Sequence, residues 1–147
     1  MVRYAVLTSS ELGAAGKRED TSGDSIVEMM SAAGHELVER VIVPDERPRI
    51  AERLRQWCFV GEVDVVLTTG GTGLGPRDVT PEATADVLEF EVPGMAEAMR
   101  AASLAVTPMA MISPPQAGGR GKTVLLHLPG SPGGLRANLD HVMPRPR

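Results

Sequence analysis

The sequence has few of the residues on which several classes of protein depend. It contains one cysteine, Cys58, so it can form neither an internal disulfide nor a cysteine-based metal cluster. Aromatic residues make up only 3% of the chain, which argues against a binder that stacks single-stranded bases. No apolar run approaches the roughly 18 residues of a membrane span, and no signal peptide is visible. We therefore expect a cytoplasmic protein with no membrane contact.

Charge and histidine spacing exclude two further classes of function. The net charge of -4 gives no general basic field for nucleic acid, so no nucleic-acid partner is expected. The three histidines, His35, His127 and His141, lack the spacing of a zinc site and are interpreted as structural. The 147 residues favour one domain over residues 1–147, with a short flexible tail from about residue 143.

The chain does contain an alternation of short apolar strands and amphipathic helices. Strands are predicted at residues 3–8, 36–43, 63–67, 109–112 and 123–128. Helices are predicted at residues 21–33, between 48 and 61, and at 81–88, 95–104 and 135–142. Consecutive strand–helix–strand units predict a parallel sheet, because parallel neighbours need such crossovers. The pattern therefore indicates an α/β fold.

A glycine-rich loop follows the strand predicted at residues 63–67. The loop, residues 68–73, leads towards a predicted helix start at Thr80-Pro81, an arrangement with which α/β sheets hold phosphates. It lacks the third glycine of a dinucleotide fingerprint and the Gly-Lys-Ser/Thr of a Walker A loop. Its backbone N–H groups and the hydroxyls of Thr68, Thr69 and Thr72 could form an anion-binding nest. A simple reversal of the chain is the alternative.

Two carboxylates come after predicted strands. Asp78 lies just beyond the glycine-rich loop, and Asp45 lies in the turn after the strand at residues 36–43. We expect the two to lie close together, because the ends of parallel strands share an edge. Carboxylates beside phosphates indicate an intervening Mg²⁺ and a metal-assisted transfer at phosphorus. The alternative is that both acids are turn or helix N-terminal residues.

Several sequence blocks, in order along the chain, resemble the MogA/MoaB family of molybdenum-cofactor biosynthesis. The blocks are Asp20-Thr21-Ser22-Gly23, Val43-Pro44-Asp45, Thr69-Gly70-Gly71-Thr72-Gly73, residues 76–83, residues 92–97 and residues 128–132. A lone Gly-Gly-Thr-Gly would be weak, but the blocks together are specific and span nearly the whole chain. The resemblance implies a three-layer α/β sandwich with a mostly parallel central sheet and helices on both faces. It also implies a homo-oligomer, a trimer or a hexamer.

The resemblance further implies a molybdopterin adenylyltransferase with molybdopterin and ATP as its small-molecule partners. The terminal phosphate of molybdopterin would attack the α-phosphorus of Mg-ATP and release pyrophosphate. Asp45 and Asp78 match the catalytic acids that hold Mg²⁺. Binding of molybdopterin and its phosphate is implied for Thr69, Gly70, Gly71, Thr72, Gly73, Gly130, Ser131 and Pro132. Nucleotide binding is implied for Thr21, Ser22 and Gly23.

A rival interpretation is a non-catalytic protein that carries molybdopterin. Relatives usually have Ser-Arg where Ser113 is followed by Pro114 here, and the loss of that cation favours the carrier. Retention of both Asp45 and Asp78 favours the enzyme. A third interpretation, the related domain of competence-damage proteins, is disfavoured by the short chain.

Overall fold

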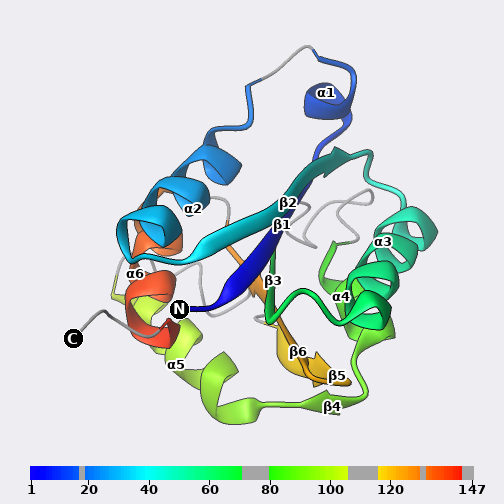
Figure 1. Ribbon diagram of the computed structural model, residues 1–147. Helices are drawn as coiled ribbons and strands as arrows, with labels where there is room; N and C mark the ends of the chain where they lie inside the picture. The colour runs from blue at the N-terminus through cyan, green and yellow to red at the C-terminus, as the bar shows by residue number, and fades with distance from the viewer. Residues whose placement is uncertain (17–18, 71–79, 106–115, 130–131, 144–147) are drawn as a thin grey trace.

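The computed structural model describes residues 1–16, 19–70, 80–105, 116–129 and 132–143 (Figure 1). Its strands form one sheet in the order β2-β1-β3-β6-β5-β4. The strands are β1 (Arg3–Ser9), β2 (Glu36–Val43), β3 (Val65–Gly70), β4 (Phe90–Glu91), β5 (Gln116–Arg120) and β6 (Thr123–Leu128). The helices are α1 (Glu11–Ala14), α2 (Thr21–Ala32), α3 (Arg47–Val60), α4 (Thr80–Val87), α5 (Pro93–Leu104) and α6 (Pro132–Val142). None of these described helices is long and apolar enough to cross a membrane.

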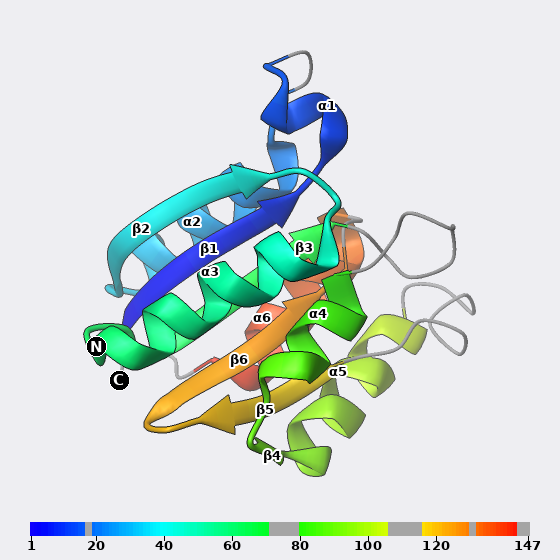
Figure 2. The same cartoon turned by 90° about the vertical axis from the view of Figure 1, so that its right-hand side faces the viewer.

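The parallel sheet predicted from the strand–helix–strand pattern is confirmed. β1 pairs in parallel with β2 and β3, and β3 pairs in parallel with β6. β5 and β4 continue the sheet in antiparallel orientation. The carboxyl ends of β1, β2, β3 and β6 therefore lie at one edge of the sheet, where α1 also lies (Figure 2). This edge is called the carboxyl edge below, and the opposite one the amino edge.

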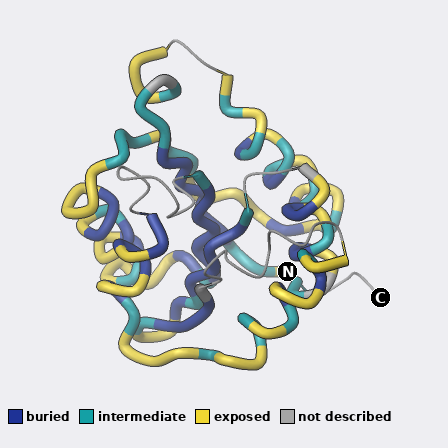
Figure 3. The backbone as a smooth tube through the Cα atoms, turned by 180° about the vertical axis from the view of Figure 1, so that it is seen from behind, coloured by how far each residue is buried: buried dark blue, intermediate teal, exposed yellow. Residues whose placement is uncertain are grey.

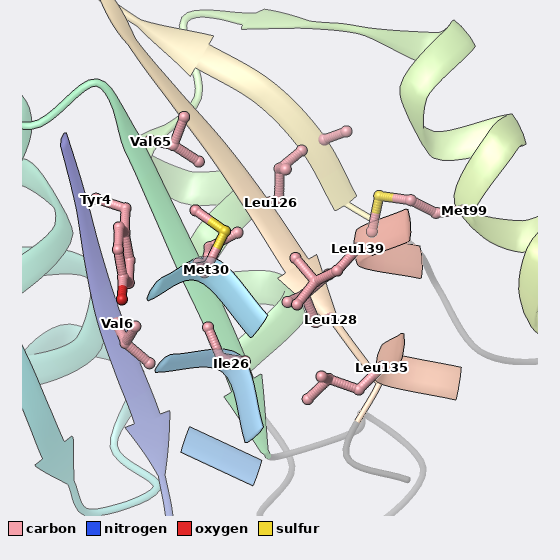
Figure 4. Packing of buried hydrophobic residues seen from close by; sticks show 12 residues of the cluster. Tyr4, Val6, Ile26, Met30, Val65, Met99, Leu126, Leu128, Leu135 and Leu139 are labelled. Carbon is pink, nitrogen blue, oxygen red and sulfur yellow. The ribbon is translucent and has the colours of Figure 1, made fainter. Parts of the chain in front are cut away.

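Helices cover both faces of the sheet, which confirms the three-layer architecture. The alternation along β1 shows the two layers: Tyr4 and Val6 face one core, and Ala5 and Leu7 face the other. The first core packs β1, β3 and β6 against α2, α5 and α6 (Figure 4). The second packs the opposite face against α3 and α4. The central strands are consequently buried, while the outer helix surfaces are exposed (Figure 3).

Glycines end two helices as expected. Gly34 and Gly61, which follow α2 and α3, have φ angles of 84° and 76°. Prolines mark helix starts that lie earlier than predicted: α3 has Pro48 in its first turn, α5 begins at Pro93 and α6 begins at Pro132. Proline suits this position because the first N–H groups of a helix have no intrahelical partner. The expected chain break at residues 92–94 is therefore the start of α5.

The prediction of a loop over residues 113–121 is wrong for β5, and β4 and α1 were not predicted. A Cβ on Gly118 would lie 2.4 Å from the carbonyl oxygen of Phe90, and one on Gly119 would lie 2.2 Å from the Phe90 ring. These glycines allow β4 to approach β5 closely, so here they belong to a strand and not to a turn. The strand predicted at residues 109–112 lies outside the described residues.

Candidate functional site

Asp45 lies at the carboxyl edge, in the turn between β2 and α3. Ser9, the last residue of β1, donates its hydroxyl proton to Asp45 Oδ1. The backbone N–H of Asp45 donates to Glu11 Oε1 at 3.2 Å, and the N–H of Ser10 donates to the carbonyl of Val43 at 2.9 Å. The segment that follows β1 thus holds the turn that carries Asp45. The Asp45 side chain is half-buried, and it lies at the edge where ligands bind in such sheets.

β3 reaches this edge farther along the chain than predicted. Thr68, Thr69 and Gly70 belong to the strand and not to the loop, because the strand continues its pairing with β1 up to Ser9. Gly70 has a φ of 85°, and a Cβ there would lie 2.2 Å from the carbonyl oxygen of Ser9. Only glycine fits this close approach. Gly70 therefore lies directly beside the residue that binds Asp45.

The Thr68 hydroxyl is not part of an anion nest as predicted. It lies 3.0 Å from Nδ1 of buried His127 and 3.5 Å from the hydroxyl of Thr84. Thr84 in turn donates to the carbonyl of Thr80 at 2.8 Å. Burial lowers the pKa of His127 to about 4, so its imidazole is neutral at pH 7. This network joins β3, β6 and α4 beneath the carboxyl edge, and it confirms the structural interpretation of His127.

Two other threonine hydroxyls are buried in the same part of the chain. Thr69 is the penultimate residue of β3, and Thr80 is the first residue of α4. Neither Oγ1 has a hydrogen-bond partner within the part of the chain that the structure describes. A buried hydroxyl without a partner costs free energy, so such groups are expected where a ligand or water completes the site.

Asp20 caps α2, which corrects the prediction of Thr21 or Ser22 as the N-cap. Asp20 Oδ1 accepts the N–H of Gly23 at 3.0 Å, as an N-cap does. Its Oδ2 accepts hydrogen bonds from the hydroxyl of Thr8 at 2.9 Å and from the guanidinium of Arg40 at 3.0 Å. Asp20, Thr21 and Ser22 are all of residue types that cap helices well. The contacts of Asp20 with Thr8 and Arg40, which are distant in sequence, favour Asp20 as the cap.

The first turn of α2 contains the predicted nucleotide-binding residues Thr21, Ser22 and Gly23. A Cβ on Gly23 would lie 2.1 Å from Asp20 Oδ2, so the turn packs directly on the capping carboxylate. Burial lowers the pKa of Arg40, but its hydrogen bonds to Asp20 and Asp24 outweigh this and raise it. The cation therefore stays charged beside the cap. The turn lies beside β1 and β2, because the Asp20 carboxylate that caps it contacts Thr8 of β1 and Arg40 of β2.

Comparison with known proteins assigns the chain to a family. A family model described as "Probable molybdopterin binding domain" matches residues 5–147. The chain belongs to this family. The resemblance inferred from the sequence blocks is therefore confirmed.

Named relatives of the molybdopterin-binding domain agree with this assignment. The molybdopterin adenylyltransferase of Helicobacter pylori strain J99 is 40% identical over 145 residues, which cover 97% of this chain and 82% of that protein. Molybdenum cofactor biosynthesis protein B of Escherichia coli K12 is 34% identical over 142 residues, covering 96% and 82% respectively. The crystal structure of the molybdopterin biosynthesis enzyme MoaB from Thermus thermophilus has a TM-score of 0.88. Its sequence identity is 48%, and the match covers 98% of this chain and 91% of that chain.

Part of the predicted site of this family member lies outside the described residues. The residues concerned are Asp78, Gly71, Thr72, Gly73, Gly130 and Ser131, together with Ser113 and Pro114 of the departure from the usual Ser-Arg. The proximity of Asp45 to Asp78 thus stays a prediction. In the observed order, β1 lies between β2, which precedes Asp45, and β3, which precedes Asp78.

Asp45 could contribute one carboxylate to a Mg²⁺ site. Within the described ranges, no three His, Cys, Asp or Glu side chains gather into a metal-binding group. Mg²⁺ is commonly held by one or two carboxylates together with substrate phosphates and waters, so a complete protein cage is not required. The half-buried Asp45 carboxylate at the carboxyl edge matches this donor set.

Sequence reasoning missed Ser9 as the partner of Asp45. The available signal was the polar run Ser9-Ser10-Glu11 directly after the first predicted strand. Because the ends of adjacent parallel strands meet at one edge, polar residues that follow one strand can contact those that follow the next. Pairing Ser9 with Asp45 requires knowing that β1 and β2 are neighbours in the sheet, and the sequence alone does not give the strand order.

Proposed function

We propose that this chain is a molybdopterin adenylyltransferase of molybdenum cofactor biosynthesis. The observation that carries the proposal is the Asp45 carboxylate at the carboxyl edge, beside Ser9 and Gly70. The proposal is supported by family membership and by the relatives named molybdopterin adenylyltransferase. The carboxyl ends of parallel strands are where α/β proteins bind their ligands, so the position of Asp45 suits a substrate site.

The proposed reaction is adenylyl transfer from Mg-ATP to the terminal phosphate of molybdopterin. A phosphate oxygen of molybdopterin forms a bond to the α-phosphorus of ATP, and the bond from that phosphorus to the oxygen that bridges the α- and β-phosphates breaks, so that this oxygen leaves with pyrophosphate. The bonding electrons leave with pyrophosphate, so atoms and charge balance. Such transfers depend mainly on positioning and on neutralising charge. Bound Mg²⁺ would supply the charge neutralisation.

The protein groups have distinct roles in this proposal. Asp45, together with Asp78, holds Mg²⁺ beside the reacting phosphates. The terminus of β3 at Thr69 and Gly70, continued by residues 71–73, receives the phosphate of molybdopterin. The buried Thr69 hydroxyl, which has no partner among the described residues, supports this role because it can donate to an anion. Gly130, Ser131 and Pro132 would form the second molybdopterin segment.

The first turn of α2 is proposed to bind the nucleotide through Thr21, Ser22 and Gly23. The positive end of the helix dipole favours phosphate at this position. The Asp20 carboxylate beside it is paired with Arg40 at 3.0 Å, which reduces its repulsion of an approaching phosphate. The pairing therefore suits a nucleotide site.

An assay of the purified protein with molybdopterin and Mg-ATP tests the function directly. We expect pyrophosphate and adenylylated molybdopterin to form in equal amounts. An enzyme-coupled assay measures the pyrophosphate, and chromatography measures the adenylylated molybdopterin. The carrier interpretation, which Pro114 favours, predicts molybdopterin binding without either product. Binding without turnover would therefore reject the enzyme and select the carrier.

The assembly state and location are further proposals. We propose a cytoplasmic homo-oligomer, a trimer or a hexamer. Large exposed apolar side chains support association, including Phe59 at 92% and Phe90 at 51% exposure. Light scattering coupled to size-exclusion chromatography measures the assembly, and a monomer at micromolar concentration would reject it.

A further inference from the structure

We infer that Ser9 is a positioning residue that fixes the orientation of the Asp45 carboxylate in the active site. The inference rests on the proposed function. Ser9 is the last residue of β1, and its hydroxyl donates to Asp45 Oδ1 across the gap to the turn after β2. Its role would be to direct the acid and not to touch the substrate.

The backbone of Ser9 is fixed on both sides. In the register of the sheet, Ser9 lies opposite Val43 of β2 and opposite Gly70 of β3. Its carbonyl oxygen occupies the space that a Cβ of Gly70 would need, 2.2 Å from that position. The residue is 3% exposed, so its hydroxyl has little freedom to turn to solvent. Ser9 therefore presents its hydroxyl from a rigid part of the sheet.

The contact leaves the acid partly free for a ligand. Ser9 binds Oδ1, and the backbone N–H of Asp45 donates to Glu11 Oε1 at 3.2 Å. No described residue hydrogen-bonds Oδ2 of Asp45, which is the oxygen left for a cation. A hydrogen bond to one oxygen fixes the plane of a carboxylate and so aims the other oxygen. Partners of this kind orient ligands and affect metal affinity even though they do not touch the metal.

Substitution of Ser9 tests the role. Ser9→Ala should lower kcat and the affinity for Mn²⁺, bound with α,β-methylene-ATP, by about 10- to 100-fold each. Enzyme turnover gives kcat, and electron paramagnetic resonance of Mn²⁺ gives the affinity. KM for molybdopterin should change little, because Ser9 orients the Asp45 carboxylate towards the metal and does not contact molybdopterin. Ser9→Thr keeps the hydroxyl and should restore both values.

Ser10→Ala is the matched control. Ser10 lies next in the chain, its hydroxyl accepts the N–H of Gly13 at 3.0 Å, and its backbone contact to Val43 survives the change. This variant should keep the wild-type Mn²⁺ affinity. If Ser9→Ala does not fold, Ser9→Cys keeps the size of the side chain with a weaker donor and should show a smaller loss.

The outcomes separate this inference from the proposed function. If Ser9→Ala keeps the Mn²⁺ affinity and the kcat of the wild type, the positioning role of Ser9 is rejected. The same holds if Ser10→Ala loses as much Mn²⁺ affinity as Ser9→Ala. Absence of Mn²⁺ binding by the wild type would also overturn it. If the wild type binds Mn²⁺ but forms no product, the proposed function fails, and the Mn²⁺ affinity of the variants still decides whether Ser9 positions Asp45.

Discussion

The two edges of the parallel sheet use their polar groups differently. At the amino edge, hydrogen bonds tie strand ends to one another: the N–H of Arg3 donates to Asp64 Oδ2 at 2.8 Å, and the hydroxyl of Thr123 donates to the carbonyl of Val63 at 2.8 Å. His35 partly departs from this pattern, because its Nδ1 accepts a backbone N–H while its Nε2 has no partner in the described structure. Most of these contacts join neighbouring strands.

At the carboxyl edge, the contacts instead position individual groups. Ser9 holds the acid Asp45, and Thr8 and Arg40 hold the acid Asp20. The Thr69 hydroxyl remains buried without a partner in the described ranges. The comparison shows that hydrogen bonds at the amino edge mainly join strand ends, apart from the unpartnered Nε2 of His35, whereas those at the carboxyl edge hold the acids Asp20 and Asp45. Substitutions at the two edges should therefore have different effects.

The largest expected effect is the loss of activity in Asp45→Asn. The change removes the charge that would hold Mg²⁺ and should lower kcat by about 100- to 1000-fold, as removal of one group that stabilises transition-state charge commonly does. The melting temperature should change little, because the Asp45 side chain is half-buried and the amide can still accept from Ser9. Steady-state kinetics and thermal unfolding measure the two quantities. Unchanged kcat would reject Asp45 as the acid of the site.

The network beneath the carboxyl edge should make stability depend on pH. The pKa of His127 is about 4 in the folded protein, below its ordinary value of about 6.5, so the unfolded chain binds the proton first. The free energy of unfolding should therefore be highest above pH 6.5 and fall by about 3 kcal/mol as pH drops to 4. Denaturant unfolding across this range measures it.

His127→Gln is the control for this pH dependence, because its side chain does not titrate. Titrating carboxylates affect wild type and variant similarly, so the difference between their unfolding free energies isolates His127. This difference should become smaller as pH falls from 6.5 to 4, because only the wild type loses the contribution of the neutral imidazole. A difference that stays constant over the window would contradict a neutral, buried His127.

Paired glycine substitutions compare the backbone at the two edges. Gly70→Ala should destabilise the protein by about 1–3 kcal/mol beyond the effect of its positive φ, because the new Cβ would lie 2.2 Å from a carbonyl oxygen. Gly121→Ala, in the β5–β6 hairpin at the amino edge, has a φ of 60° and no atom within 4 Å of the new Cβ. It should cost about 1 kcal/mol. Equal losses in chemical denaturation would contradict the close packing of Gly70 on Ser9.

The smallest effect is expected for Asp64→Ala at the amino edge. Loss of the hydrogen bond from Arg3 should lower the free energy of unfolding by about 1 kcal/mol without changing kcat. That backbone hydrogen bond lowers the pKa of Asp64, so its stabilisation is present above pH of about 4 and lost as pH falls below it. Denaturation at pH 7 and at pH 3 measures the change. A large loss of activity would show that the amino edge also serves function.

The sequence predicted the central architecture because local patterns encode it. Apolar β-branched runs gave the strands, and helical spacing put Ile50, Leu54 and Trp57 on a face that is buried. Local patterns could not reveal β5, because Gly118 and Gly119 are of a residue type typical of turns. Their place in a strand depends on the close contact with Phe90 of β4, which is distant in sequence. The misplaced α5 start has the same origin, since a proline can either break a chain or begin a helix.

The candidate site was predictable only in part, for a similar reason. Asp45 could be located because it follows a strand that the pattern identifies. Its partner Ser9 could not, because their contact depends on β1 and β2 being neighbours. Asp20 likewise becomes the cap of α2 only because Thr8 and Arg40 reach it from β1 and β2. Contacts between distant segments decide these details, and residue type alone does not encode them.

The strand order also has a consequence for the order of folding. β3 gains its second neighbour only from β6, where Val65 pairs with Val124, so a central strand stays open on one side until a late segment arrives. The earlier segments, β1 to β3 with α2 and α3, can associate first because they pair among themselves. If β1 to β3 pair before β6 docks, the open side of β3 exposes unpaired backbone N–H and C=O groups, and an open strand edge of this kind is prone to wrong pairing.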